Sequence, residues 1–219
     1  MRSFGNAVSL GYQYLETDVR ATSDGVVVVF HDEDLSRLCG RPGRISEIRA
    51  AELATARVHG TEPVPTLDDV LDAWPDVRLN IDCKSADAAR PLVDVINRHG
   101  ALDRVCLTSF DDRRVRTMRR MIGEGVCTAA GRRELTVLRL TGWSGGAQAA
   151  QVPVRRGPVT VVTAGFIRHC HNRGIAVHVW TIDDAVEMHR LLDLGVDGIM
   201  TDRPSVLREV LVGRGTWHE

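Results

Sequence analysis

The sequence predicts an α/β fold, a TIM (β/α)₈ barrel that lacks its first strand and part of its first helix. Short β-branched runs alternate with helical segments through most of the chain, and such alternation indicates a parallel sheet covered by helices. Counting gives seven parallel strand candidates, whereas a closed barrel needs eight. Because Phe4, Ala7, Val8 and Leu10, ending at Gly11, resemble the tail of a helix, the missing strand is expected before Met1.

The expected strands are short and rich in valine, isoleucine and other apolar residues. One run, Val26–Phe30, returns after an Asp24-Gly25 pair, which is a strong hairpin signal. It should therefore run antiparallel to the strand before it. The parallel candidates are Glu16–Val19, Val77–Lys84, Val105–Phe110, Val126–Ala130, Ala150–Val154, Ala176–Thr181 and Gly198–Thr201.

Helical patterns lie between these strands. The clearest can be capped by Asp183 or Asp184 and ends at Gly195, where a left-handed residue belongs. A Gly-, Arg- and Pro-rich stretch at about 33–65, called the insertion here, interrupts the alternation within a single domain expected to span 1–219. The expected helices are Leu67–Ala73, Ala86–Arg98, Asp112–Met121, Glu134–Leu140, Ala164–Arg173, Asp184–Leu194 and a last one from Pro204 to about Val212.

Composition excludes several classes of partner. The 219 residues carry a formal net charge of −1, so no overall field attracts nucleic acid or an anionic membrane. The apolar runs fall short of the roughly 20 residues of a transmembrane helix, and no secretory signal is evident at the N-terminus. The five cysteines are scattered without a CxxC spacing. We expect reduced thiols and a cytoplasmic protein.

Acidic residues gather where strands are expected to end, which is where barrel enzymes carry their sites. Glu16 and Asp18 are two apart on a strand and share a face, as do Asp82 and Lys84 on another. Three carboxylates are ligands that Mg²⁺ or Ca²⁺ accepts. A buried salt-bridge network centred on Lys84 explains the same spacing equally well.

Two further residues have both a functional and a structural interpretation. His31 ends the returning strand beside Asp32, and its near-neutral titration suits general acid/base catalysis. The alternative interpretation is that His31 has a structural role only and forms a hydrogen bond with its neighbour at the strand end. Trp180, at the end of a later strand, can line a pocket or simply pack.

The sequence resembles the glycerophosphodiester phosphodiesterase family, and the matching motifs occur in the same order from about residue 3 to residue 212. The segments that carry it are Tyr14–Val19, Thr22–Gly25, Phe30–Asp32, Pro65–Leu71, Asn80–Lys84, Val177–Thr181 and Gly195–Pro204. Together these motifs are highly specific.

The resemblance implies a TIM barrel and assigns roles to the candidate residues. Glu16, Asp18 and Asp82 would hold a divalent cation, Mg²⁺ or Ca²⁺, although the family usually has glutamate at the third position. Lys84 would contact the phosphate, and His31 would be one of two catalytic histidines. Trp180 would belong to the substrate pocket.

The implied reaction is metal-assisted acid/base hydrolysis of a small-molecule glycerophosphodiester to glycerol 3-phosphate and an alcohol. The family's His-Arg-Gly strand end and Pro-Glu-Asn segment are not found in this sequence. They are expected before Met1 and would carry the second histidine and a phosphate-binding arginine. Activity is then expected to be impaired, or the chain is a catalytically silent barrel that binds phosphate esters or metal. Open barrel edges also favour self-association.

Overall fold

The structure is a computed structural model that describes residues 1–123 and 125–217. Contacts divide the chain into two compact units. The first unit comprises Met1–Asn6 and Gln13–Cys127, and the second comprises Ala7–Tyr12 and Thr128–Glu219. The prediction of a single domain over 1–219 stays a prediction.

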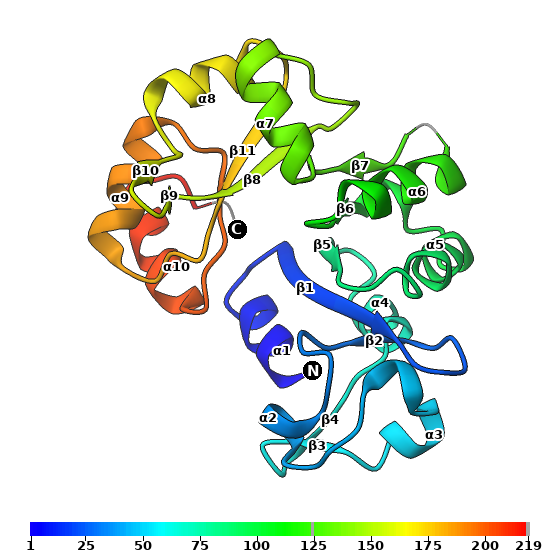
Figure 1. The fold of residues 1–219 in the computed structure, drawn as a ribbon. Coiled ribbons are helices and arrows are strands. Elements are labelled where there is room, and N and C mark those ends of the chain that lie inside the picture. The colour runs from blue at the N-terminus through cyan, green and yellow to red at the C-terminus, as the bar shows by residue number, and fades with distance from the viewer. Residues whose placement is uncertain (124, 218–219) are drawn as a thin grey trace. The chain divides into compact units, whose positions relative to one another are not determined.

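The first unit is built on a five-stranded sheet with the order β2-β1-β5-β6-β7 (Figure 1). β1 and β2 are antiparallel, with Val19 opposite Val29, as the Asp24-Gly25 pair predicts. β5 runs parallel to both β1 and β6. The strands are β1 (Tyr14–Ala21), β2 (Val27–Val29), β5 (Arg78–Cys83), β6 (Val105–Thr108) and β7 (Cys127–Thr128).

Alternation along β1 determines which side chains are available for a site. Leu15, Thr17 and Val19 are buried on one face, whereas Glu16 and Asp18 point to the other. Helices α5 and α6 pack against each other beside this sheet (Figure 1). The remaining elements outside the insertion are helical, namely α4 (Leu67–Ala73), α5 (Ala89–Arg98), η2 (Leu102–Arg104) and α6 (Asp112–Ile122). Helix α1 (Arg2–Ser9) is divided between the two units.

The insertion folds around a small core of its own. Leu35, Ile45 and Leu53 are almost completely buried there, together with Phe30 from the end of the hairpin. The hairpin turn holds the insertion in place, because Ile48 O accepts a hydrogen bond from Ser23 N at 2.9 Å. The elements are α2 (Ser36–Cys39), η1 (Ile45–Glu47), α3 (Ala50–Leu53), β3 (Arg57–Val58) and β4 (Glu62–Pro63).

The second unit contains a parallel three-stranded sheet with the order β12-β11-β8. Helix residues such as Ile167, Met188 and Leu191 pack with the buried strand residues in one apolar core. The N-terminal part of this unit joins it through Tyr12, whose hydroxyl donates to Pro204 O at 2.6 Å. The elements are α7 (Arg132–Thr141), β8 (Ala149–Pro153), β9 (Arg155–Arg156), β10 (Val159–Thr160), α8 (Ala164–His171), β11 (Ala176–Trp180), α9 (Ala185–Leu194), β12 (Gly198–Ile199) and α10 (Pro204–Gly213).

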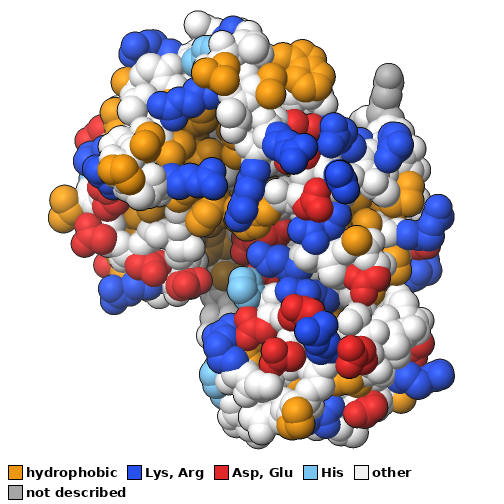
Figure 2. All heavy atoms as spheres, in the orientation of Figure 1, with side chains coloured by type: hydrophobic (Ala, Val, Ile, Leu, Met, Phe, Trp, Pro, Cys, Tyr) orange, Lys and Arg blue, Asp and Glu red, His pale blue; other side chains and the backbone are white. Residues whose placement is uncertain are grey.

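Two of the expected strands are reduced to two residues each. The run at 126–130 forms only β7 and an isolated bridge between Ala129 and Ala149, and the last strand is limited to β12. Within the described part of the chain, no helix is both long and apolar enough to cross a membrane. On the face drawn in Figure 2, acidic and basic side chains are interspersed.

Candidate active site

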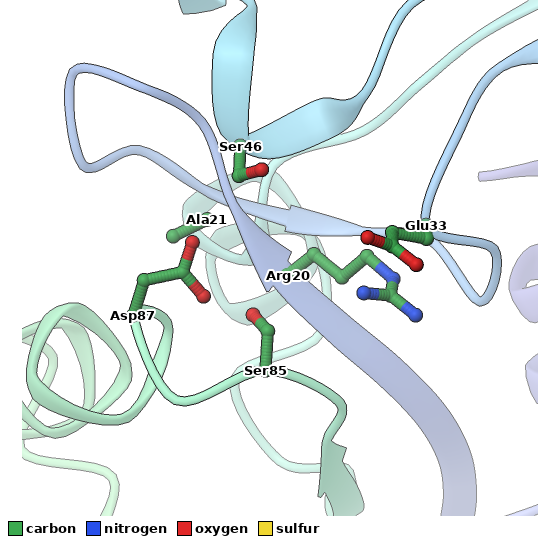
Figure 3. A pocket seen from close by; sticks show the side chains of 6 residues that line it. All are labelled: Arg20, Ala21, Glu33, Ser46, Ser85 and Asp87. Atoms are coloured by element: carbon green, nitrogen blue, oxygen red, sulfur yellow. The ribbon is translucent and has the colours of Figure 1, made fainter.

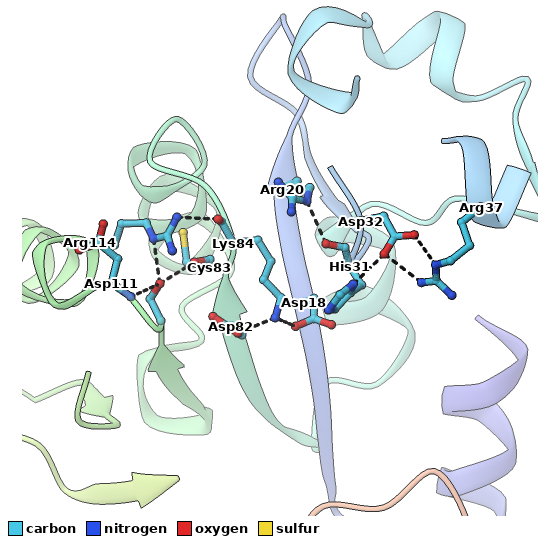
Figure 4. Close-up of polar contacts among 11 residues, drawn as sticks. Asp18, Arg20, His31, Asp32, Arg37, Asp82, Cys83, Lys84, Asp111 and Arg114 are labelled. Atoms are coloured by element: carbon cyan, nitrogen blue, oxygen red, sulfur yellow. Dashed lines mark hydrogen bonds and ion pairs between the residues drawn. The ribbon is translucent and has the colours of Figure 1, made fainter. Parts of the chain in front are cut away.

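The central feature of the first unit is a lysine held between two aspartates. Asp18 on β1 lies opposite Asp82 on β5 in the parallel register, so their side chains leave the same face of the sheet. The Lys84 Nζ atom lies 2.8 Å from Asp18 Oδ1 and 2.7 Å from Asp82 Oδ2 (Figure 4). The structure therefore brings together three of the predicted site residues.

Burial controls the charges in this group. Burial alone would lower the pKa of Lys84, but hydrogen bonds and charge from Asp18 and Asp82 outweigh it, so the pKa is raised and the ammonium stays charged. Burial raises the pKa of Asp82, against the lowering effect of Lys84. One buried carboxylate oxygen, Asp82 Oδ1, has no hydrogen-bond partner among the described residues.

The backbone of Lys84 is fixed by a residue that the sequence did not single out. The Arg114 guanidinium, on α6, donates from Nη1 to Lys84 O at 2.5 Å and from Nε to Ser109 Oγ at 2.8 Å. The Ser109 hydroxyl in turn donates to Cys83 O at 2.7 Å. Arg114 thereby ties the ends of β5 and β6 to a helix (Figure 4). The only feature of the sequence that points to Arg114 is its position in the first turn of the helix, after Asp111 and Asp112.

His31 is positioned by the strand pairing just described. Phe30 N donates to Asp18 O at 3.0 Å, which sets the start of the segment that carries the histidine beside β1. The His31 side chain is 61% exposed, and its Nδ1 lies 2.7 Å from Asp32 Oδ1. With Nδ1 engaged by a carboxylate, the Nε2 atom is the one available for proton transfer.

Asp32 is itself held by a forked ion pair. Arg37 donates from Nε to Asp32 Oδ2 at 2.7 Å and from Nη2 to Asp32 Oδ1 at 2.9 Å. The hydrogen bonds from Arg37 and then from His31 lower the pKa of Asp32 to about 2. Asp32 therefore remains ionised throughout the neutral range. No periodic signal in the sequence marks this contact.

The three carboxylates predicted to bind metal are not equally placed. Glu16 is exposed on β1 opposite Asn80, and no three acidic, histidine or cysteine side chains in the described residues are grouped to hold an ion. The buried, unpartnered Asp82 Oδ1 nevertheless offers the hard oxygen that a divalent cation prefers. The type of oxygen donor therefore suits such a cation at all three positions, and the three side chains, Asp18, Asp82 and Glu16, lie on the same face of the sheet.

Trp180 lies in the second unit, at the C-terminal end of β11. It is partly exposed, while Val177 and Val179 point to the opposite, buried face of the strand. The predicted place of Trp180 in a substrate pocket is not tested by this arrangement and stays a prediction.

The fold and site define the class of the chain, an α/β enzyme with carboxylates, a lysine and a histidine near the ends of parallel strands. A sequence model of the glycerophosphoryl diester phosphodiesterase family matches residues 1–206. The chain belongs to that family.

Relatives and solved structures agree with this assignment. A relative from Mycobacterium tuberculosis, named "Probable glycerophosphodiester phosphodiesterase 2", is 41% identical over 99% of this chain and 86% of its own length. A solved structure from Silicibacter pomeroyi superposes with a TM-score of 0.84 over all of this chain and 90% of that one, at 21% identity. A phosphodiesterase from Oleispira antarctica, solved in complex with the product sn-glycerol-3-phosphate, gives 0.80 at 18% identity, covering 96% and 90% of the two chains. The predicted α/β fold of the TIM-barrel type is confirmed.

Proposed function

We propose that this chain hydrolyses small glycerophosphodiesters to glycerol 3-phosphate and an alcohol, as a phosphoric diester hydrolase of lipid metabolism. The observation that carries the proposal is the charged Lys84 between Asp18 and Asp82. The segment of the Asp32-held His31 is joined to Asp18 by the hydrogen bond from Phe30 N to Asp18 O. An ammonium at such a position can bind a phosphodiester oxygen. The family membership and the relative at 41% identity support the reaction class.

We assign Glu16, Asp18 and Asp82 as the residues that would hold a divalent cation, Mg²⁺ or Ca²⁺. The bound cation would neutralise phosphate charge and polarise the diester oxygens. The unpartnered Asp82 Oδ1 supports this assignment, because a buried carboxylate oxygen without a partner is costly unless an ion or donor satisfies it.

His31 would move the proton. Asp32 accepts from Nδ1 and thereby fixes the ring orientation, leaving Nε2 to exchange a proton with the attacking or leaving oxygen. Arg37 keeps Asp32 ionised, so this orientation does not change over the neutral range. Trp180 is assigned to the substrate pocket by its match to the family motif.

We also propose a cytoplasmic location, which the cysteines support. All five are free thiols, which is typical of a reducing compartment. None of the roles proposed above requires a disulfide.

The experiment is a coupled assay of glycerol 3-phosphate release from glycerophosphoethanolamine and glycerophosphocholine. Turnover is expected with Mg²⁺ or Ca²⁺ and is expected to stop when EDTA is added. Substrate binding without any turnover in either metal would contradict the proposal and would identify the chain as a silent barrel.

A further inference from the structure

A cavity of about 200 Å³ lies in the first unit, between the end of β1, the segment after β5 and the insertion (Figure 3). It contains none of the residues assigned above to catalysis or metal binding. Its lining residues are Arg20, Ala21, Glu33, Ser46, Ser85 and Asp87.

The cavity nevertheless adjoins the candidate active site at three points. Arg20 is two residues beyond Asp18 on the same face of β1. Ser85 directly follows Lys84. Arg20 Nε also donates to the His31 carbonyl oxygen at 3.0 Å, which links the cavity wall to the histidine segment. The cavity therefore borders the segments that carry Asp18, Lys84 and His31.

The walls of the cavity are polar and carry unused hydrogen-bonding capacity. The Ser85 hydroxyl is buried and has no hydrogen-bond partner among the described residues. In Figure 3 it lies on the same side of β1 as the Asp87 carboxylate, near Ala21, whereas the Arg20 side chain extends toward Glu33. Buried polar atoms are rarely left unpaired, so this hydroxyl indicates a position that a ligand or water occupies.

One carboxylate of the lining has no cationic partner among the described residues. Glu33 forms an ion pair with Arg44 at 3.0 Å, whereas Asp87 forms no ion pair with a described residue. Arg20 supplies one positive charge at the opposite wall. With Glu33 paired to Arg44, the lining retains one guanidinium, Arg20, and one exposed carboxylate, Asp87, which is the acceptor available for an ammonium group.

Size and composition narrow the choice of alcohol further. The volume is below the roughly 300 Å³ at which pockets for drug-sized ligands begin, so a small head group fits better than an acyl chain. A quaternary ammonium such as choline has no N–H to donate and is recognised best by aromatic faces. No lining residue is aromatic. A primary ammonium can instead donate to Asp87 and Ser85.

We propose that this cavity binds the alcohol arm of the diester and selects an alcohol with a primary ammonium group, as in glycerophosphoethanolamine. The inference rests on the proposed function, because it assigns the head group of that same reaction. It also gives the insertion a role, since Glu33 and Ser46 come from it.

The test compares kcat/KM for glycerophosphoethanolamine and glycerophosphocholine. The wild type is expected to prefer ethanolamine by roughly tenfold, the value of about one charge-assisted hydrogen bond. Asp87→Asn should bring that ratio close to one, and Ser85→Ala should reduce it less. Asp76→Asn is the matched control, because this exposed aspartate precedes β5, about 20 Å from the strand end that carries Ser85. An unchanged ratio in Asp87→Asn overturns the inference.

A binding measurement separates this inference from the proposed function. Calorimetry in EDTA reports affinity for each diester without turnover. Tighter binding of the ethanolamine diester that is lost in Asp87→Asn supports the cavity assignment even if no turnover is found with any metal. Turnover with equal affinity for the two diesters leaves the proposed function intact and rejects the head-group assignment.

Discussion

Lys84 is held at both ends, by two carboxylates at its ammonium and by the Arg114 guanidinium at its carbonyl. A lysine side chain normally loses considerable rotamer entropy when it is fixed. Here the ion pairs fix the ammonium before any substrate arrives, so less ordering remains for the binding step. His31 is different, because it has one carboxylate partner and is mostly exposed.

Replacing His31 tests its role in proton transfer. His31→Asn is expected to lower kcat by about 10²–10⁴-fold, the usual contribution of a positioned acid or base. The change is measured by glycerol 3-phosphate release, with circular dichroism to confirm folding. His189→Asn is a suitable control, since this exposed histidine lies on α9 in the second unit. Equal activity of the His31→Asn variant and the wild type would contradict the assignment.

The Asp32–Arg37 fork gives a prediction that depends on pH. The pKa of Asp32 is about 2 in the folded chain, compared with an ordinary value of about 3.9. Because the folded pKa is depressed, the stability from this carboxylate is present above about pH 4 and is lost as the pH falls through about 2. Arg37→Ala should raise the pKa of Asp32 toward its ordinary value. Carboxyl ¹³C NMR titration measures this shift, and an unchanged midpoint would contradict it.

At the scale of the elements, α4 is the helix whose start is best defined. Thr66 Oγ1 accepts from Asp69 N at 3.0 Å, and Asp69 Oδ2 accepts from Thr66 N at 2.9 Å. This reciprocal arrangement satisfies two backbone donors at the helix start. The helix buries Leu67, Val70 and Leu71.

Thr66→Ala should therefore lower the free energy of unfolding by about 1 kcal/mol. Urea denaturation measures the loss, and the matched control is Thr61→Ala, in an exposed turn of the insertion. A loss no larger than that of the control would show that the cap contributes nothing to stability.

Local patterns predicted the elements better than they predicted the contacts between them. The alternation in β1 and β5 correctly placed Asp18, Asp82 and Lys84 on one face. The alternation of side chains along a strand does not reveal the role of Arg114, because its partner Lys84 is 30 residues away in sequence and on a different element. The partnership depends on tertiary packing of α6, which no local window contains.

Strand length was also overestimated, for a related reason. An apolar run such as 126–130 has strand propensity throughout, but only the residues with a neighbouring strand form the ladder. Pairing partners, and not propensity, set the ends of β7 and β12. Metal coordination could not be predicted from the sequence either. Local alternation shows that side chains share a face of a strand, but the distance of Glu16 from the two aspartates depends on how the strands pack.

For the whole molecule, a bound divalent cation should stabilise the folded state. Mg²⁺ or Ca²⁺ at 100 times its Kd adds about 2.7 kcal/mol, which raises the Tm of a chain of this size by several degrees. The increase is measured by thermal denaturation with and without EDTA. Glu16→Gln is the most informative variant, because it leaves both Lys84 ion pairs intact. It should reduce the increase in Tm that the cation causes. Asp103→Asn serves as the control, and equal shifts in all three proteins would reject the three-carboxylate assignment.

Self-association is a second prediction at this scale. Within the described residues, the parallel sheets are open and not closed into a ring, and unpaired sheet edges invite pairing with a second copy. Sedimentation velocity over a range of concentrations is expected to show a reversible dimer. A single monomeric species at every concentration would contradict the prediction.

The separate core of the insertion has an evolutionary consequence. Leu35, Ile45 and Leu53 pack among themselves and against the hairpin end, so substitutions that reshape this segment need not disturb β5 or the lysine at its end. Descendants of one ancestor can then exchange the alcohol they recognise while they retain the same phosphate chemistry. A graft of residues 33–65 between relatives would therefore exchange the Glu33 and Ser46 wall of the cavity while Ser85 and Asp87 stay in place.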